Sequence, residues 1–102
     1  MQTIKMLLTY DIKPDLQDRY YQFMLGEMVP TLQSLGLMMG GAWHTAYGDY
    51  PVRLVEFLAE DREALDKVLE TPAFDRLESE LQRYVENYTR RSVPLRDNVF
   101  QF

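Results

Sequence analysis

The sequence contains no cysteine and a single histidine, His44. A chain without cysteine cannot form disulfide bonds, thiolate metal sites or a cysteine nucleophile. One histidine cannot build a zinc site alone, and no carboxylates stand at ligand spacing on its predicted strand. We therefore expect neither a metal nor a cofactor. The lack of cysteine is also compatible with a reducing compartment.

Long apolar runs are also missing. No segment approaches the roughly 18 uninterrupted apolar residues of a membrane span, and residues 1–6 lack the basic opening of a secretory signal. We therefore expect a cytoplasmic protein that does not enter the membrane. Lys and Arg together number 11 against 16 Asp and Glu, which gives a net charge of −5. Because an acidic chain repels phosphate backbones, we expect no nucleic-acid partner.

The sequence does have periodic apolar patterns, over a length that suits one domain. Its 102 residues, 46% of them hydrophobic, predict a single globular domain over residues 1–102. Residues 3–11 alternate with period two, which predicts a strand. Residues 15–35 recur at three and four, which predicts a helix that Pro30 should kink near Val29.

The rest of the chain is predicted to form three further strands and a second helix. Residues 38–47 and 52–59 read as strands joined by a turn over 48–51, and so predict an antiparallel hairpin. A second helix is expected over 62–88, with a break at Thr71–Pro72. A short last strand is expected over 89–95.

The predicted hairpin carries apolar side chains on both faces. With Tyr47 opposite Val52, one face holds Trp43, Thr45, Tyr47, Val52, Leu54, Glu56 and Leu58. The other holds Ala42, His44, Ala46, Arg53, Val55, Phe57 and Ala59. Two helices can cover only one face of a four-stranded sheet, and an exposed apolar sheet face is larger than monomers usually carry. We therefore expect a homodimer joined through the sheet face.

The order of elements, with Trp43 in the second strand and a turn at Gly48, resembles the dimeric α/β-barrel superfamily, which includes monooxygenase-like and NIPSNAP-like small proteins. The resemblance implies a ferredoxin-like α+β fold of β-α-β-β-α-β order. An antiparallel sheet would have two helices on one face and a sheet-to-sheet dimer on the other. The superfamily holds cofactor-free monooxygenases, lactone isomerases and haem-degrading enzymes. The haem-degrading branch has a histidine ligand on the second helix, and residues 62–88 contain none.

Two residues are candidates for chemistry. His44 titrates near neutrality and could act as a general base, or it could be a half-buried strand residue bonded to a neighbour. Glu56 lies between Val55 and Phe57. Inside the barrel it could serve as a base; otherwise it faces water or pairs with an arginine of a partner chain.

Aromatic side chains with polar tips often line pockets for planar ligands, although more of them serve as core. The predicted pocket consists of Tyr10, Tyr20, Trp43, His44, Tyr47 and Glu56. The resemblance implies binding or metal-free transformation of a small aromatic or polyketide-like molecule, by an oxygenase or isomerase. The alternative is a non-enzymatic dimer whose barrel is filled by its own side chains. The sequence leaves open which of these holds, and what the tail Phe100–Phe102 does.

Overall fold

The structure is a computed structural model of the chain. It describes the backbone of residues 2–47 and 50–95, and the side chains of these residues except those of 44–52. The elements are β1 (Ile4–Ile12), η1 (Pro14–Leu16), α1 (Gln17–Phe23), η2 (Met24–Met28), α2 (Val29–Ser34), β2 (Met38–Tyr47), β3 (Tyr50–Ala59), α3 (Arg62–Leu69), α4 (Pro72–Tyr84) and β4 (Val85–Pro94).

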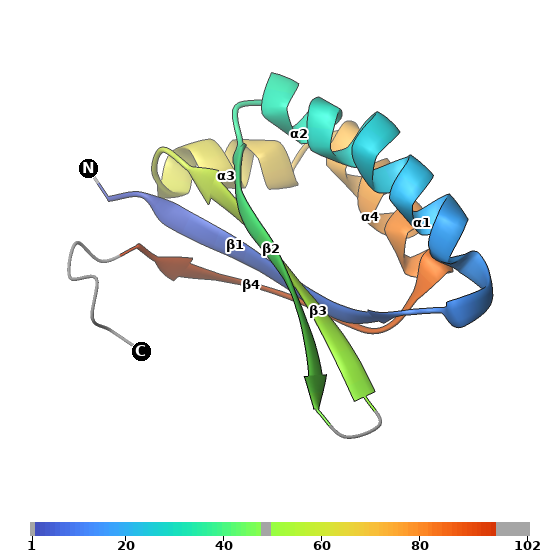
Figure 1. Cartoon of the computed structure of the whole chain (residues 1–102). Coiled ribbons are helices and arrows are strands. Elements are labelled where there is room, and N and C mark those ends of the chain that lie inside the picture. The colour runs from blue at the N-terminus through green and yellow to red at the C-terminus, as the bar shows by residue number, and fades with distance from the viewer. Residues whose placement is uncertain (1, 48–49, 96–102) are drawn as a thin grey trace.

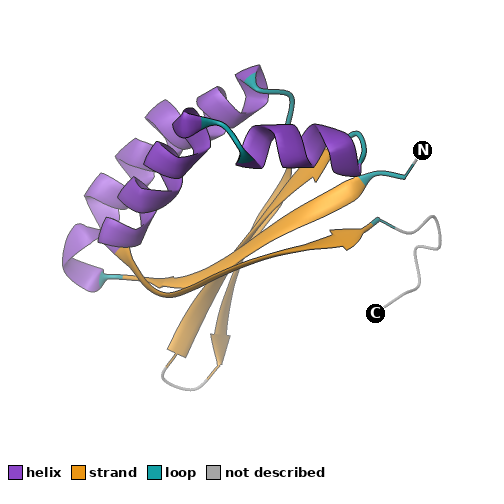
Figure 2. Ribbon diagram, turned by 180° about the vertical axis from the view of Figure 1, so that it is seen from behind, coloured by secondary structure: helices purple, strands orange, loops and turns teal. Residues whose placement is uncertain are grey.

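The four strands form one antiparallel sheet in the order β2-β3-β1-β4. The helices lie together on one face of this sheet, and no described element covers the other face (Figures 1 and 2). This arrangement confirms the predicted ferredoxin-like α+β fold. Within the described part of the chain, no helix is long and apolar enough to span a membrane.

The core lies between the sheet and the helices. On β1, the residues at alternate positions from Ile4 to Tyr10 are at most 5% exposed, whereas Lys5, Leu7 and Thr9 on the opposite face are only half-buried. The period of two in the sequence therefore separates a helix-covered face from an open face. The remaining core includes Phe23, Met28, Leu32, Leu37, Val55, Phe57, Leu65, Phe74, Leu77 and Leu81.

The first helical segment, which runs from η1 to α2, is continuous but irregular. Pro14 opens it at the first position of η1, where a missing amide hydrogen costs nothing. The predicted disturbance near Val29 takes the form of a π-helical turn over Met24–Met28, immediately before Val29 and Pro30. At the other end Gly36 adopts φ 109°, and the amide of Leu37 donates to the carbonyl of Leu32 at 2.9 Å. This is a left-handed glycine cap, which ends the helix and satisfies a carbonyl of its last turn.

The hairpin register differs from the prediction by two residues. Val52 pairs with Thr45 rather than with Tyr47, and β3 already begins at Tyr50. Residues 50 and 51 of the predicted turn therefore lie in a strand, while Gly48 and Asp49 lie outside the described residues. Because side chains alternate with period two, a shift of two residues leaves the described side chains of the hairpin on the faces that were predicted.

The second helical segment, which comprises α3 and α4, ends earlier than predicted. Thr71 and Pro72 separate α3 from α4 as expected, but α4 stops at Tyr84 and β4 starts at Val85. Asn87 has φ 57°, a left-handed conformation that a helix cannot contain. The pairing of β4 with β1 shifts register at this point, between Thr9 and Asp11. Tyr88 satisfies both a helical and a strand period, and this ambiguity caused the error.

Candidate functional site

A cluster of tyrosines lies between the sheet and the first helix. Tyr10 of β1 and Tyr20 of α1 are each 1% exposed, and their hydroxyl groups are hydrogen-bonded to each other. Their rings meet edge to face with centroids 5.7 Å apart. Tyr88 of β4 stacks on Tyr10 at 6.3 Å, and Tyr21 packs against Tyr20 at 5.0 Å. The cluster thus joins two strands to the first helix.

Arg53 brings a positive charge to this cluster. It pairs with Tyr10 across β1 and β3, and its guanidinium carbon lies 5.8 Å from the centre of the Tyr21 ring. The exposed side chain of Tyr21 therefore supports the cation through its π-face. The Nε atom of Arg53 is buried and has no hydrogen-bond partner among the described residues. A buried guanidinium donor without an acceptor is costly, unless a ligand or another group supplies one.

Among the described side chains of the cluster, more hydrogen-bond donors are present than acceptors available to them. Two tyrosine hydroxyls hold two hydrogens, and the bond between Tyr10 and Tyr20 employs only one of them. One hydroxyl hydrogen and the Nε hydrogen of Arg53 therefore remain to be accepted. An oxygen anion that lay beside Arg53 would satisfy both.

The tyrosines are held in their neutral form. Burial is the main cause that raises the pKa of Tyr10 far above its ordinary value, and the neighbouring Tyr20 adds to the effect. Burial likewise raises the pKa of Tyr20, against lowering contributions from its hydrogen bond with Tyr10 and from Arg53. Both hydroxyls consequently stay protonated at physiological pH, so neither serves as a base.

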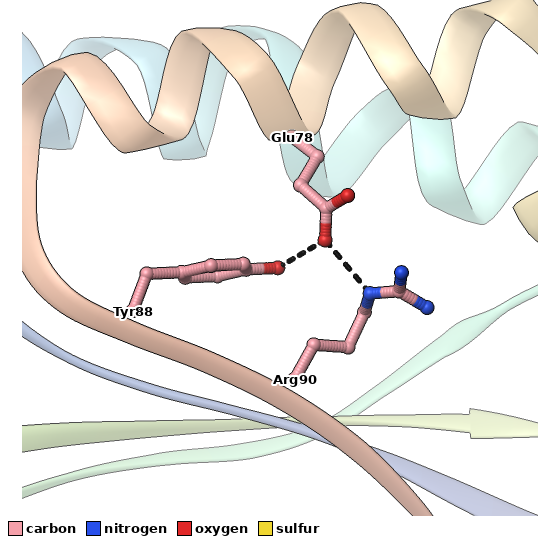
Figure 3. Close-up of polar contacts among 3 residues, drawn as sticks. All are labelled: Glu78, Tyr88 and Arg90. Carbon is pink, nitrogen blue, oxygen red and sulfur yellow. Dashed lines mark hydrogen bonds and ion pairs between the residues drawn. The ribbon is translucent and has the colours of Figure 1, made fainter.

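A polar network on the far side of the cluster fixes Tyr88 in place. Oε2 of Glu78, on α4, accepts a hydrogen bond from the hydroxyl of Tyr88 at 2.6 Å and one from Nε of Arg90 at 2.7 Å. Figure 3 shows the carboxylate descending from the helix between these two side chains of β4. The Arg90 guanidinium also lies 5.3 Å from the centre of the Phe74 ring. The position of Tyr88 against Tyr10 is therefore set from α4.

The open face of the sheet forms a second candidate site. It contains a hollow of about 570 Å³ lined by Lys5, Leu7, Trp43, Leu54 and Glu56. Oε1 of Glu56 lies 3.5 Å from Nζ of Lys5, so the two opposite charges in the lining face each other. Trp43 is 49% exposed here. We name this region, defined by these five residues, the open-face hollow.

Two glycines in β2 make room for the side chains of this hollow. The strand bulges between Met39 and Gly41. A Cβ atom on Gly40 would come within 2.8 Å of Oε2 of Glu56, and one on Gly41 within 2.7 Å of the Trp43 ring. Both distances are shorter than van der Waals contact, so the glycines allow Glu56 and Trp43 to lie flat against the strand.

The structure divides the predicted pocket between the two faces of the sheet. Tyr10 and Tyr20 lie together on the helix side, whereas Trp43 and Glu56 lie on the open face. His44 pairs with Arg53 through the backbone and Tyr47 pairs with Tyr50, but the side chains of His44 and Tyr47 lie outside the description. Among the described residues, no three histidine, aspartate or glutamate side chains gather as a metal site would require.

Three members of the cluster were not among the predicted site residues. Arg53 had been placed on the face opposite to Glu56, and this is where it lies. The alternation that puts Tyr10 on the helix side, together with an antiparallel pairing of the first and third strands, could have brought Arg53 beside Tyr10. Tyr21 and Tyr88 carried no such signal, because they depend on the turn of α1 and on where α4 ends.

Comparison with known proteins identifies the fold. No family model and no curated protein matches the sequence. Solved structures do match: the Mycobacterium tuberculosis protein Rv0793 has a TM-score of 0.67 at 12% identity, with 95% of this chain and 98% of that one covered. A NIPSNAP domain protein from Burkholderia xenovorans gives 0.66 at 15% identity, with 96% and 97% covered. An antibiotic biosynthesis monooxygenase gives 0.59 at 20% identity, with 93% and 98% covered.

These likenesses place the chain in a class defined by its fold. It has the ferredoxin-like architecture of NIPSNAP-like and antibiotic biosynthesis monooxygenase-like proteins, which are dimeric α/β-barrel proteins. The ferredoxin-like fold expected from the sequence is thereby confirmed. At identities of 20% and below, the likeness shows the fold alone.

Proposed function

We propose that this protein binds a small aromatic molecule bearing an acidic or phenolic oxygen, with that oxygen beside Arg53. The observation that carries the proposal is the surplus of donors around Arg53. Its Nε has no acceptor among the described residues, and the Tyr10–Tyr20 pair has a spare hydroxyl hydrogen. The aromatic ring of the ligand would extend toward Tyr21, which already contacts the guanidinium. Arginine suits this role because its planar donors match carboxylate geometry.

The described side chains of the cluster supply a cation and neutral donors, and no carboxylate lies among them. Such a set stabilises negative charge on a bound oxygen. The same set would stabilise an enolate or phenolate during metal-free oxygenation or isomerisation. We propose an aromatic or polyketide-like substrate for such a reaction, and an antibiotic biosynthesis monooxygenase is among the structures that share this fold. Binding is the step that the described residues support directly, and turnover would need a proton acceptor in addition.

Calorimetric titration with a series of hydroxybenzoates and hydroxynaphthoates tests the binding. In Arg53→Met, the affinity for the best ligand should fall by about 10- to 100-fold, because hydrogen bonds to charged groups contribute ~1.5–3 kcal/mol. Arg62→Met is the matched control, since Arg62 on α3 donates to Ser92 and not to this cluster. Equal loss in both variants, or no binding of any compound to the wild-type protein, would refute the proposal.

We further propose that the functional unit is a homodimer closed through the open face of the sheet. The face carries Trp43 at 49% exposure, with Leu7 and Leu54 beside it in the open-face hollow. A second copy would bury these side chains and remove an apolar surface from water. Sedimentation should then give a species of twice 12.1 kDa at micromolar concentration. A monomer under these conditions would contradict the dimer.

One observation favours the non-enzymatic alternative for the open face. Lys5 and Glu56 already neutralise each other in the open-face hollow, so its lining offers a ligand no unpaired charge. In a dimer the partner's side chains would fill this hollow, and the barrel would be packed by the protein itself. The cluster at Arg53 lies on the other side of the sheet and does not depend on how the barrel is filled.

A further inference from the structure

A separate apolar hollow lies at the end of the sheet where β1 begins and β3 ends. Its volume is about 430 Å³, a size suited to aromatic side chains. Met38, Leu58 and Ala59 provide apolar walls, and Gly36, the capping residue of α2, forms part of the lining. Glu60 adds one acidic side chain to this lining. We name this region the end hollow.

The last described residue of the chain lines the end hollow. Leu95, which follows β4, belongs to its lining, and the backbone amide of Leu95 donates to the carbonyl of Thr3 at 2.7 Å. This bond continues the pairing of β4 with β1, in which Pro94 lies opposite Ile4. The segment that comes next, residues 96–102, therefore starts at the wall of an apolar hollow.

The sequence of that segment complements the end hollow. It reads Arg-Asp-Asn-Val-Phe-Gln-Phe, with a basic residue at its start and two phenylalanines at alternate positions. In an extended segment, Phe100 and Phe102 point to the same side. Arg96 is the first residue beyond Leu95, and both Leu95 and Glu60 line the end hollow.

We propose that residues 96–102 fold back onto their own domain, with Phe100 and Phe102 in the end hollow and Arg96 paired with Glu60. Phe100 is five residues beyond Leu95, and at roughly 3.3–3.6 Å per residue this length is ample for a return into a hollow that Leu95 lines. Attachment at the rim gives the segment an effective concentration that no free partner matches. The inference is independent of the ligand site at Arg53.

Because the chain has no cysteine, a single introduced thiol reports on the end hollow. In Met38→Cys, alkylation should be slow, and adding Phe100→Ser and Phe102→Ser should raise its rate by about 10-fold, since the covering segment then no longer limits access. Leu25→Cys is the control: Leu25 is 72% exposed, comparable to Met38 at 67%, and lies in η2 on the helix layer. Its rate should be unchanged by the same two substitutions.

Sedimentation of each variant accompanies the rates, so that a change of assembly is recognised. If both phenylalanine substitutions leave the alkylation rate of Met38→Cys unaltered while the assembly is unchanged, the segment does not cover the end hollow and the proposal is overturned. Calorimetry at the Arg53 site should give the same affinity in all these variants, so failure here is distinct from failure of the ligand proposal.

A double variant decides which chain the segment covers. Mild oxidation of Met38→Cys combined with Phe100→Cys should give a disulfide within one chain, seen as a compact monomer on a non-reducing gel. The pair Leu25→Cys with Phe100→Cys should give none. A disulfide between two chains would show that the segment docks on a neighbour, and the absence of any disulfide would show that Phe100 does not reach Met38. Either result refutes the proposal.

Discussion

The hydroxyl of Tyr88 donates to Glu78 at 2.6 Å and so ties β4 to α4 (Figure 3). Because Arg90 donates to the same carboxylate oxygen, Glu78→Ala leaves two donors without their acceptor. We expect the free energy of unfolding to fall by about 1–3 kcal/mol, measured by urea denaturation.

Glu63→Ala is the control for this change. Glu63 pairs with Lys67 at 3.6 Å, but both side chains are more than 70% exposed, and exposed pairs of this kind contribute only about 0.3–0.5 kcal/mol. A loss in Glu78→Ala no larger than that in Glu63→Ala would show that the network of Figure 3 does not stabilise the fold.

The tyrosine cluster predicts a loss of stability in alkali. The pKa values of Tyr10, Tyr20 and Tyr88 are raised in the folded protein, mainly through burial. The folded state therefore keeps phenolic protons that the unfolded chain releases above about pH 10. The free energy of unfolding should accordingly be constant below that pH and fall as the pH rises past it.

Chemical denaturation between pH 8 and 11.5 would measure this slope, whose limit is ~1.36 kcal/mol per pH unit for each tyrosine that stays protonated. Tyr10→Phe removes one such proton, so its slope should be shallower than that of the wild type. Phe23→Leu is the control, because it alters the buried core without removing a phenolic proton, and its slope should match the wild type. A slope that Tyr10→Phe does not change would contradict the assignment.

The proposed homodimer predicts that a charge placed on the open face of the sheet separates the two copies. Leu54 pairs with Trp43 across β2 and β3 and lines the open-face hollow. In Leu54→Asp, an unpaired carboxylate would be buried at the dimer interface, at a cost of several kcal/mol. We expect only monomers in sedimentation, with the circular dichroism of the fold retained. Leu25→Asp, on the helix layer, should leave the assembly unchanged.

Substitution of Gly41 should change the fluorescence of Trp43, the only tryptophan in the sequence. A methyl group there would come within 2.7 Å of the Trp43 ring, so Gly41→Ala must displace that ring from the strand. We expect a shift of the tryptophan emission maximum, with the far-ultraviolet circular dichroism retained. Gly26→Ala is the control, because nothing lies within 4 Å of the added Cβ. An unshifted emission in Gly41→Ala would mean that the ring does not lie over Gly41.

Much of the fold followed from local patterns. The alternation of β1, the disturbance just before Pro30 and the break at Thr71–Pro72 each depend on neighbours in the sequence. The boundary between α4 and β4 did not follow, because Val85 and Tyr88 fit a helical stripe as well as a strand. Pairing with β1 and the left-handed Asn87 decide it, and both are tertiary features.

The candidate site was harder to predict than the fold. Tyr10 and Tyr20 were named from their residue type, yet their partner Arg53 becomes visible only through the pairing of β1 with β3. Trp43 and Glu56 were grouped with the tyrosines, but the sheet separates these two residues from the cluster. A sequence shows which face of one strand a residue occupies, whereas assembling a site requires knowing which strands are neighbours.

The π turn at Met24–Met28 determines which side chains of the helical segment from α1 to α2 face the sheet. An α-helix advances about 100° per residue, and a π turn advances less. Buried residues recur at Tyr20, Met24, Met28 and Leu32, a spacing of four that would spiral off the sheet in an uninterrupted α-helix. The wider turn cancels this drift. Deleting one residue from it would leave eleven residues from Tyr20 to Leu32, about three full α-helical turns, so a regular α-helix would then keep both side chains on the sheet side.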